Sequence, residues 1–225
     1  MIIERARLAL YYSPLGIKNM TTKETVFERT YEDYLAKVSG IDFNSVKQKL
    51  GVEVKRNEVM IPLFGKPHKV SENGITDPSG KQPTLDICVI LCKYLLLCPD
   101  VFPKEKEWVS FRGLKDSGPL TKYFANDVER AISTYFTGRL GEMEEASKAL
   151  GGYTPAIEVT YDLSMQFDAL PQVPVIMLYN DADDEFPAKC SVLFERRAEN
   201  YLDAECLAMV GRLLFTYLKK AGGSC

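Results

Sequence analysis

The chain has 225 residues, of which 46% are hydrophobic and 26% are charged, together with 12 prolines and 15 glycines. This composition is typical of a folded globular protein and excludes disordered and fibrous classes. The formal net charge of -3 offers no overall attraction to nucleic acid or to an anionic membrane surface.

The charge is unevenly distributed along the chain. From Glu158 to Glu205 there are eleven acidic and three basic residues, a local net charge of -8, so the remainder of the chain carries +5. This acidic region would repel phosphate backbones and favour a cation or a basic partner. We therefore expect no nucleic-acid partner.

Hydropathy predicts no membrane segment. The longest apolar stretch, Ile87 to Leu97, is interrupted by Lys93, and as a helix it would span roughly 16 Å, about half of the hydrocarbon thickness. Near the start only Leu8 to Tyr12 is continuously apolar, which is too short for a secretory signal. These features predict a cytoplasmic protein with no membrane contact.

The first third of the chain predicts two helices and then strands. Residues 21–24 resemble a capping box ahead of a helix that ends near Gly40, and a second helix over 43–50 has Asp42 as N-cap and Gly51 as its C-terminal glycine. The hydrophobic period then changes to two, which predicts a hairpin over 52–63. Turn residues at 73–80 continue this meander.

Helices and strands continue in blocks in the rest of the chain. Thr84 precedes an apolar helix over 85–97, and Trp108 to Arg112 alternates like a strand. Two helices, 120–136 and 142–150, precede strands over 157–167, 174–179 and 191–194, with a loop at 168–172 between the first two. A final amphipathic helix covers 203–219, and we expect the tail 221–225 to be disordered.

This order of elements predicts an α+β fold, in which mixed or antiparallel sheet elements pack with several helices. Strict βαβ alternation is absent, and no proline-rich or serine-rich linker divides the chain. We therefore expect one domain over residues 1–225.

The six cysteines are too sparse for a disulfide framework, so we expect free thiols. Cys88, Cys92 and Cys98 have the spacing C-x3-C-x5-C inside an apolar helix, which matches neither zinc sites nor common iron–sulfur patterns. Core packing is the favoured interpretation, and Cys225 is expected to be an exposed terminal thiol. No iron–sulfur cluster is expected in this chain.

Several short segments resemble one known family. The stretches 173–179 (VPVIMLY), 183–187 (DDEFP), 192–194 (VLF) and 201–205 (YLDAE) resemble the C-terminal signature of the prokaryotic domain of unknown function 3786, and 108–112 resembles its middle segment. The resemblance implies an anaerobic bacterial or archaeal source, where such domains can follow a cysteine-rich iron–sulfur module. This chain has no four-cysteine motif of that kind, and the family carries no assigned activity.

The most unusual local feature is the acidic segment after the strand 174–179. Asp181, Asp183, Asp184 and Glu185 repel one another, and a divalent cation such as Ca²⁺ or Mg²⁺ would relieve that repulsion, with Asp181, Asp183 and Glu185 as candidate metal ligands. The alternative is a solvated turn in which an aspartate accepts backbone N–H groups.

Other candidate groups are fewer. Arg112 lies on a strand with aromatic neighbours, where its guanidinium could pair with a ligand carboxylate or phosphate or with a structural carboxylate. His68 is the single histidine, and no nucleophile elbow accompanies it, so we expect it to be structural or exposed. The cofactor is unknown.

These observations favour a binding or accessory protein, with a ligand or partner surface near Arg112 and residues 181–187. The partner would be another protein or a small ligand. The alternative is an enzyme, for which the carboxylates indicate metal-assisted hydrolysis or carboxylate acid–base chemistry.

Overall fold

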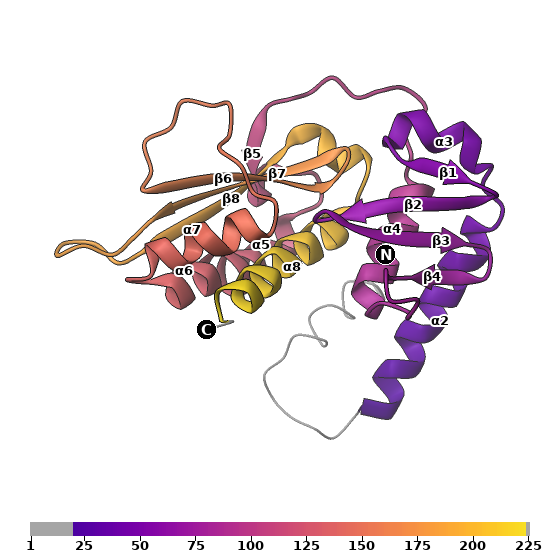
Figure 1. Cartoon of the computed structure of the whole chain (residues 1–225), viewed down its shortest axis with the longest axis horizontal. Helices are drawn as coiled ribbons and strands as arrows, with labels where there is room; N and C mark the ends of the chain where they lie inside the picture. The colour runs from indigo at the N-terminus through magenta and orange to yellow at the C-terminus, as the bar shows by residue number, and fades with distance from the viewer. Residues whose placement is uncertain (1–19, 224–225) are drawn as a thin grey trace.

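The computed structural model describes the backbone of residues 20–223 and the side chains of residues 29–223. Two antiparallel sheets, each with its own helices, lie beside each other (Figure 1). We call residues 20–97 the first lobe and residues 108–223 the second lobe. The expected α+β fold is confirmed. The side chains of the capping box and Cys225 lie outside the described residues.

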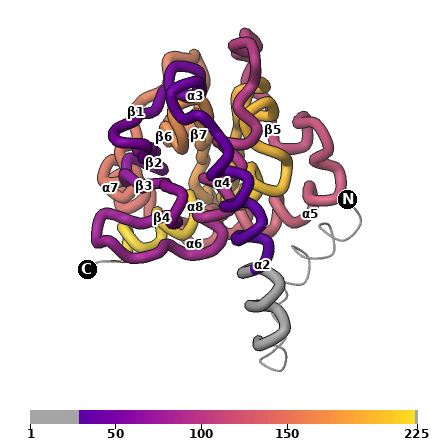
Figure 2. The backbone as a smooth tube through the Cα atoms, turned by 90° about the vertical axis from the view of Figure 1, so that its right-hand side faces the viewer, coloured from indigo at the N-terminus to yellow at the C-terminus, as the bar shows by residue number. Residues whose placement is uncertain are grey.

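The first lobe is a meander backed by helices. Helices α2 (Met20–Val38) and α3 (Phe43–Leu50) precede a sheet of order β1-β2-β3-β4, and α4 (Leu85–Leu96) follows it. Figures 1 and 2 show α4 behind one face of this sheet. The strands are β1 (Glu53–Lys55), β2 (Glu58–Leu63), β3 (Lys66–Ser71) and β4 (Gly74–Thr76).

The second lobe places a sheet over a layer of helices. Its strand order is β5-β8-β7-β6, and α5 to α8 lie on one face (Figure 1). The strands are β5 (Trp108–Ser110), β6 (Leu163–Leu170), β7 (Val173–Asn180) and β8 (Lys189–Glu195), and the helices are α5 (Thr121–Phe124), α6 (Arg130–Phe136), α7 (Leu140–Ala149) and α8 (Ala204–Gly222). Val175, Met177 and Tyr179 of β7 face these helices within the main core.

A π-helical turn, Ala125–Glu129, joins α5 to α6. The end of α5 and this turn pack closely on α8 because Gly211 has no side chain. A Cβ atom there would lie 2.5 Å from Cε2 of Phe124 in α5 and 3.2 Å from Cγ1 of Val128 in the turn. The turn also brings Glu129 to the sheet, where its Oε1 accepts the N–H of Val192 at 3.0 Å. Glu129 thus satisfies a donor of β8 on the side where β5 has already ended.

The turn between β2 and β3 connects the two sheets. Its first residue, Phe64, is buried and has a φ of 47°, a left-handed conformation that is uncommon for a non-glycine residue. The N–H of Phe64 donates to the carbonyl of Ala169 in β6 at 2.9 Å, and its ring meets Tyr217 of α8 edge to face. These contacts with the second lobe offset the backbone strain.

Three expected boundaries were wrong. Residues 157–162 form no strand; β6 begins at Leu163 and continues to Leu170, so most of the expected loop at 168–172 is strand. Alternation at 157–161 produces no strand because no strand in the described part of the chain pairs with it. β5 ends at Ser110, and Arg112 lies in a 3₁₀ turn. Helix α8 reaches Gly222, so the expected tail is helical at its start.

The thiols of α4 lie in the core. Cys88 and Cys92 are fully buried, as expected, and burial raises the pKa of each to about 12. The cysteines at 88, 92, 98, 190 and 206 form no disulfide. Among the described helices, none is long and apolar enough to cross a bilayer.

We predict that Leu91→Ala lowers the free energy of unfolding by about 2 to 5 kcal/mol, because Leu91 of α4 is 0% exposed. Leu97, at the end of the same helix, is 37% exposed and serves as the matched control, with an expected loss under about 1 kcal/mol for Leu97→Ala. Urea unfolding measures both. Equal losses of unfolding free energy for Leu91→Ala and Leu97→Ala would show that Leu91 does not lie in the core.

We also predict a pH dependence from His68, which is buried in β3 with its Nδ1 2.9 Å from the carbonyl of Lys66. Burial lowers its pKa below the ordinary 6.5, so the unfolded chain binds the proton more readily than the folded protein. Stability from this group is therefore complete above pH 6.5 and is lost as the pH falls, by at most about 1.4 kcal/mol per pH unit.

Comparison with His68→Gln isolates this contribution, because every other titrating group is present in both proteins. In urea unfolding, the free energy of unfolding of the wild type should fall relative to that of the variant when the pH is lowered from 7 to 5. A difference that is independent of pH would show that His68 keeps an ordinary pKa in the folded protein.

Candidate functional site

A hollow of about 650 Å³ lies beside the β7–β8 turn, at one end of the second sheet. One wall belongs to this turn and the other to the segment that precedes β6. The lining residues are Thr160, Tyr161, Asp162, Asn180, Asp181, Asp183, Phe186, Pro187, Ala188 and Lys189. The hollow therefore includes part of the acidic segment that the sequence singled out.

Asp181 anchors the turn to the helical layer. Its Oδ1 accepts the N–H groups of Gly138 and Ala182 at 2.8 Å each and the hydroxyl of Tyr179 at 3.0 Å. Partial burial opposes ionisation of this carboxyl, but the two N–H donors and the hydroxyl outweigh it, so the pKa of Asp181 is below its ordinary value. Asp181 is thus a fixed negative charge at neutral pH.

Asp183 holds the tip of the turn. Its Oδ1 accepts the N–H groups of Glu185 and Phe186 at 2.8 and 2.6 Å, and its own N–H donates to the carbonyl of Phe186 at 3.0 Å. Asp184 and Glu185 are exposed, with no hydrogen bond or ion pair from their carboxylates to other described residues. The aspartate-stabilised turn, one of the two alternatives, describes this geometry.

The candidate metal ligands Asp181, Asp183 and Glu185 are not brought together. Within the described residues, no three histidine, cysteine, aspartate or glutamate side chains form a group that could hold a metal ion. The aspartates instead orient their Oδ1 atoms toward backbone N–H groups of their own turn and of the α6–α7 connection.

The opposite wall belongs to a segment that we call the strap, residues 153–162, between α7 and β6 (Figure 1). Tyr153 exchanges two backbone hydrogen bonds with Gln166 at one end. At the other end, Oδ2 of Asp162 accepts the N–H of Asp181 at 2.8 Å, which fastens the strap to the β7–β8 turn. Tyr161 of the strap remains 40% exposed.

Arg112 does not join this site. It is exposed in the 3₁₀ turn after β5, and no hydrogen bond or ion pair links its guanidinium to the 181–187 segment in the described structure. The neighbouring Gly113 carbonyl accepts a hydrogen bond from Arg196 at 3.2 Å. Arg112 is also not among the residues that line the hollow.

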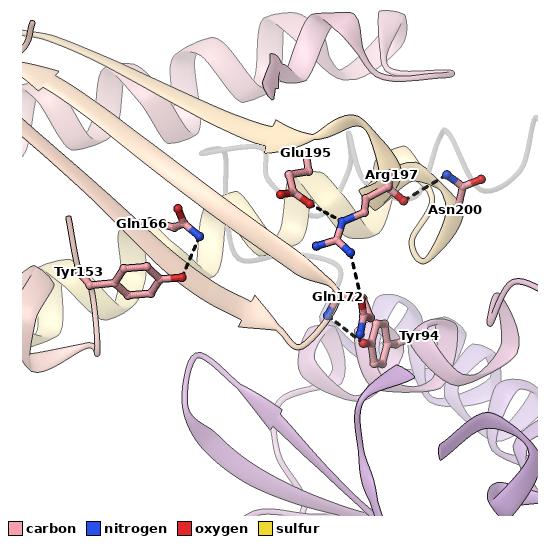
Figure 3. Close-up of polar contacts among 7 residues, drawn as sticks. All are labelled: Tyr94, Tyr153, Gln166, Gln172, Glu195, Arg197 and Asn200. Atoms are coloured by element: carbon pink, nitrogen blue, oxygen red, sulfur yellow. Dashed lines mark hydrogen bonds and ion pairs between the residues drawn. The ribbon is translucent and has the colours of Figure 1, made fainter. Parts of the chain in front are cut away.

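Figure 3 shows a polar cluster that the sequence analysis missed. Arg197 forms an ion pair with Glu195, and its Nη1 donates to Oε1 of Gln172 at 3.1 Å. The Gln172 N–H donates to the hydroxyl of Tyr94 at 3.1 Å, and that hydroxyl donates to the carbonyl of Leu50 at 2.7 Å. This chain of contacts runs from the second lobe into the first.

Burial gives this cluster its energetic weight. The side chains of Arg197 and Glu195 are 17% and 11% exposed, and a buried charge requires a partner. The pair lies at the lobe junction, at the end of the sheet opposite the hollow. The side-chain bonds of Arg197 go to Glu195 and Gln172 of the same chain. The opposite charges of Glu195 and Arg197 after an apolar strand are the one sequence feature that indicates this cluster. They do not identify Gln172 or Tyr94 as partners.

Glu129 is a second group that the sequence did not identify. Burial raises its pKa above the ordinary value, opposed by the N–H of Val192 and by the charge of Lys189. It lies beneath β8 and does not line the hollow. Its role in the described structure is to bind the strand.

We predict that Arg197→Met lowers the free energy of unfolding by about 3 to 5 kcal/mol, because it leaves the buried carboxylate of Glu195 without a partner. Arg196→Met is the matched control. Arg196 pairs with Glu107, which is 65% exposed, and its loss should leave stability nearly unchanged. Urea unfolding measures both losses. Similar losses of unfolding free energy in the two variants would show that the Arg197–Glu195 pair stabilises the fold no more than the exposed pair does.

Comparisons with known proteins identify a family. A family model described as domain of unknown function, DUF3786, matches residues 42–217, from the N-cap of α3 to the last turns of α8. No curated protein and no solved structure matches the chain significantly. The matched range includes both sheets, the hollow and the junction cluster. The chain therefore belongs to the DUF3786 family.

Proposed function

We propose that this protein is a binding or accessory protein that docks a ligand or partner in the hollow between the strap and the β7–β8 turn. The observation that carries the proposal is the pair of exposed aromatic side chains at this hollow, Tyr161 at 40% and Phe186 at 65% exposure. Exposed apolar groups beside a concave surface are typical of interaction sites.

The rigidity of the surroundings supports the same proposal. The hollow adjoins β7, whose residues Val173 to Tyr179 are all buried, and Asp181 ties the turn to the helical layer at Gly138. A preorganised surface loses less conformational entropy when it binds. The negative charge of the lining disfavours phosphate groups, so we propose no nucleic-acid partner.

The enzyme alternative has less support. The lining of the hollow contains no cysteine, histidine or serine, and its aspartates hold backbone N–H groups. Glu129, whose pKa is raised as in many acid–base catalysts, lies outside the hollow. We place the protein in the cytoplasm, in keeping with the free thiols of α4.

Site-specific photo-crosslinking tests the proposal. A benzophenone amino acid at position 161 or 186 should give a discrete adduct to the same partner in native cells, because both positions face the hollow. Position 102, where Phe102 is 46% exposed and does not line the hollow, is the matched control and should give none.

A second variant confirms that the surface itself is responsible. Phe186→Ser should reduce the adduct from position 161 and leave the melting temperature nearly unchanged, because Phe186 is exposed. No adduct from position 161 or 186, or the same adduct pattern from position 102, would exclude the hollow as a binding surface.

A further inference from the structure

The hollow combines aromatic walls with negative charge. Tyr161 comes from the strap and Phe186 from the β7–β8 turn, so the two exposed rings belong to separate walls. Asp162, Asp181 and Asp183 supply three negative charges, and Lys189 supplies one positive charge. Aromatic faces beside carboxylates attract organic cations, because the ring quadrupole and the carboxylate charge act in the same direction.

The aspartates present free acceptor atoms. Asp181 and Asp183 use Oδ1 for the bonds to their own chain, and their Oδ2 atoms accept no hydrogen bond from any described residue. Asp162 accepts a hydrogen bond through Oδ2, and its Oδ1 accepts none from any described residue. Since the backbone donors hold each carboxylate in place, no rearrangement is needed before these oxygens can receive a donor.

We propose that the hollow receives a lysine or arginine side chain of a partner polypeptide. This inference rests on the proposed function and specifies the chemistry of the partner. The cationic head would lie between Tyr161 and Phe186 and donate to the free aspartate oxygens. Lys189 is the internal competitor, because it places a positive charge in the same lining.

A polypeptide partner is favoured over a free amine by the surface beyond the hollow. Val159 of the strap is 40% exposed and lies outside the lining, as do the exposed Asp184 and Glu185. A small cation inside the hollow would contact none of these three, whereas a segment with further apolar and basic residues would cover them.

Peptide titration of isotope-labelled protein, followed by amide NMR shifts, tests the inference. The probe is a blocked pentapeptide with arginine between two leucines, and its control carries glutamine in place of arginine. The arginine peptide should bind about five- to tenfold more tightly, with shifts at residues 160–162 and 181–189, and added salt should weaken it. Free arginine amide should bind more weakly than the arginine peptide.

Charge variants provide the decisive comparison. Asp183→Asn keeps the Oδ1 acceptor for the turn but removes the charge, and it should weaken the arginine peptide about three- to fivefold; Lys189→Gln should strengthen it by a similar factor. Glu53→Gln, on exposed β1 of the first sheet, is the matched control and should have no effect.

The outcomes separate this inference from the proposed function. Equal binding of the arginine and glutamine peptides, or no binding of either, overturns the cationic preference, while crosslinked adducts from positions 161 and 186 would still support a binding surface. Arginine amide binding as tightly as the peptide overturns the polypeptide source. Loss of both the adducts and peptide binding overturns the inference and the proposed function together.

Discussion

The arrangement of the two lobes depends on a buried charge at their junction. Arg197 pairs with Glu195 because both side chains are mostly buried, and a charge with little access to water needs a partner. The guanidinium also donates to Gln172, whose backbone N–H donates to the hydroxyl of Tyr94 in α4. The β6–β7 turn is thereby held against the first lobe. The β2–β3 turn makes the reciprocal contact, from Phe64 to Ala169. Together these contacts link the two sheets, beside the packing of α4 against α8.

This junction occupies one end of the second sheet and leaves the other end available. The β7–β8 turn projects beyond the helices at the far end (Figure 1), where it meets the strap and forms the hollow. Strands that are anchored at the junction thus carry a surface loop at their opposite ends. This is a common way to build a binding site, because rigid strands position side chains that solvent and partners can still reach.

The helical layer supports the same strands from below. The π-helical turn at Ala125–Glu129 widens the helix where Gly211 permits close contact with α8, and Glu129 then reaches the N–H of Val192. A regular helix would distribute these side chains differently around its axis. β8 therefore keeps its hydrogen bonds beyond the short β5, although a half-buried carboxylate must be accommodated there.

Local sequence determined the elements whose signals are short-range. Asp42 and Gly51 bound α3, as predicted. Asp203, expected as the first residue of the last helix, is its N-cap and accepts the N–H of Cys206. The acidic turn was also recognised from sequence, since four carboxylates after an apolar strand stand out without any tertiary information. The family resemblance and the α+β class followed from patterns of the same kind, whereas the choice between mixed and antiparallel sheets was made by the structure.

Only the tertiary structure decided the contacts between distant residues. Residues 157–161 alternate like a strand, but no described strand pairs with them, so they lie in the strap. Arg112 does not line the hollow beside the acidic turn. Glu195, Arg197, Gln172 and Tyr94, by contrast, are joined across the lobes. The physical reason is that periodicity and capping depend on residues a few positions apart in the sequence. A buried charge or an unpaired strand edge is instead satisfied by residues that are distant in sequence and become neighbours only in the folded chain.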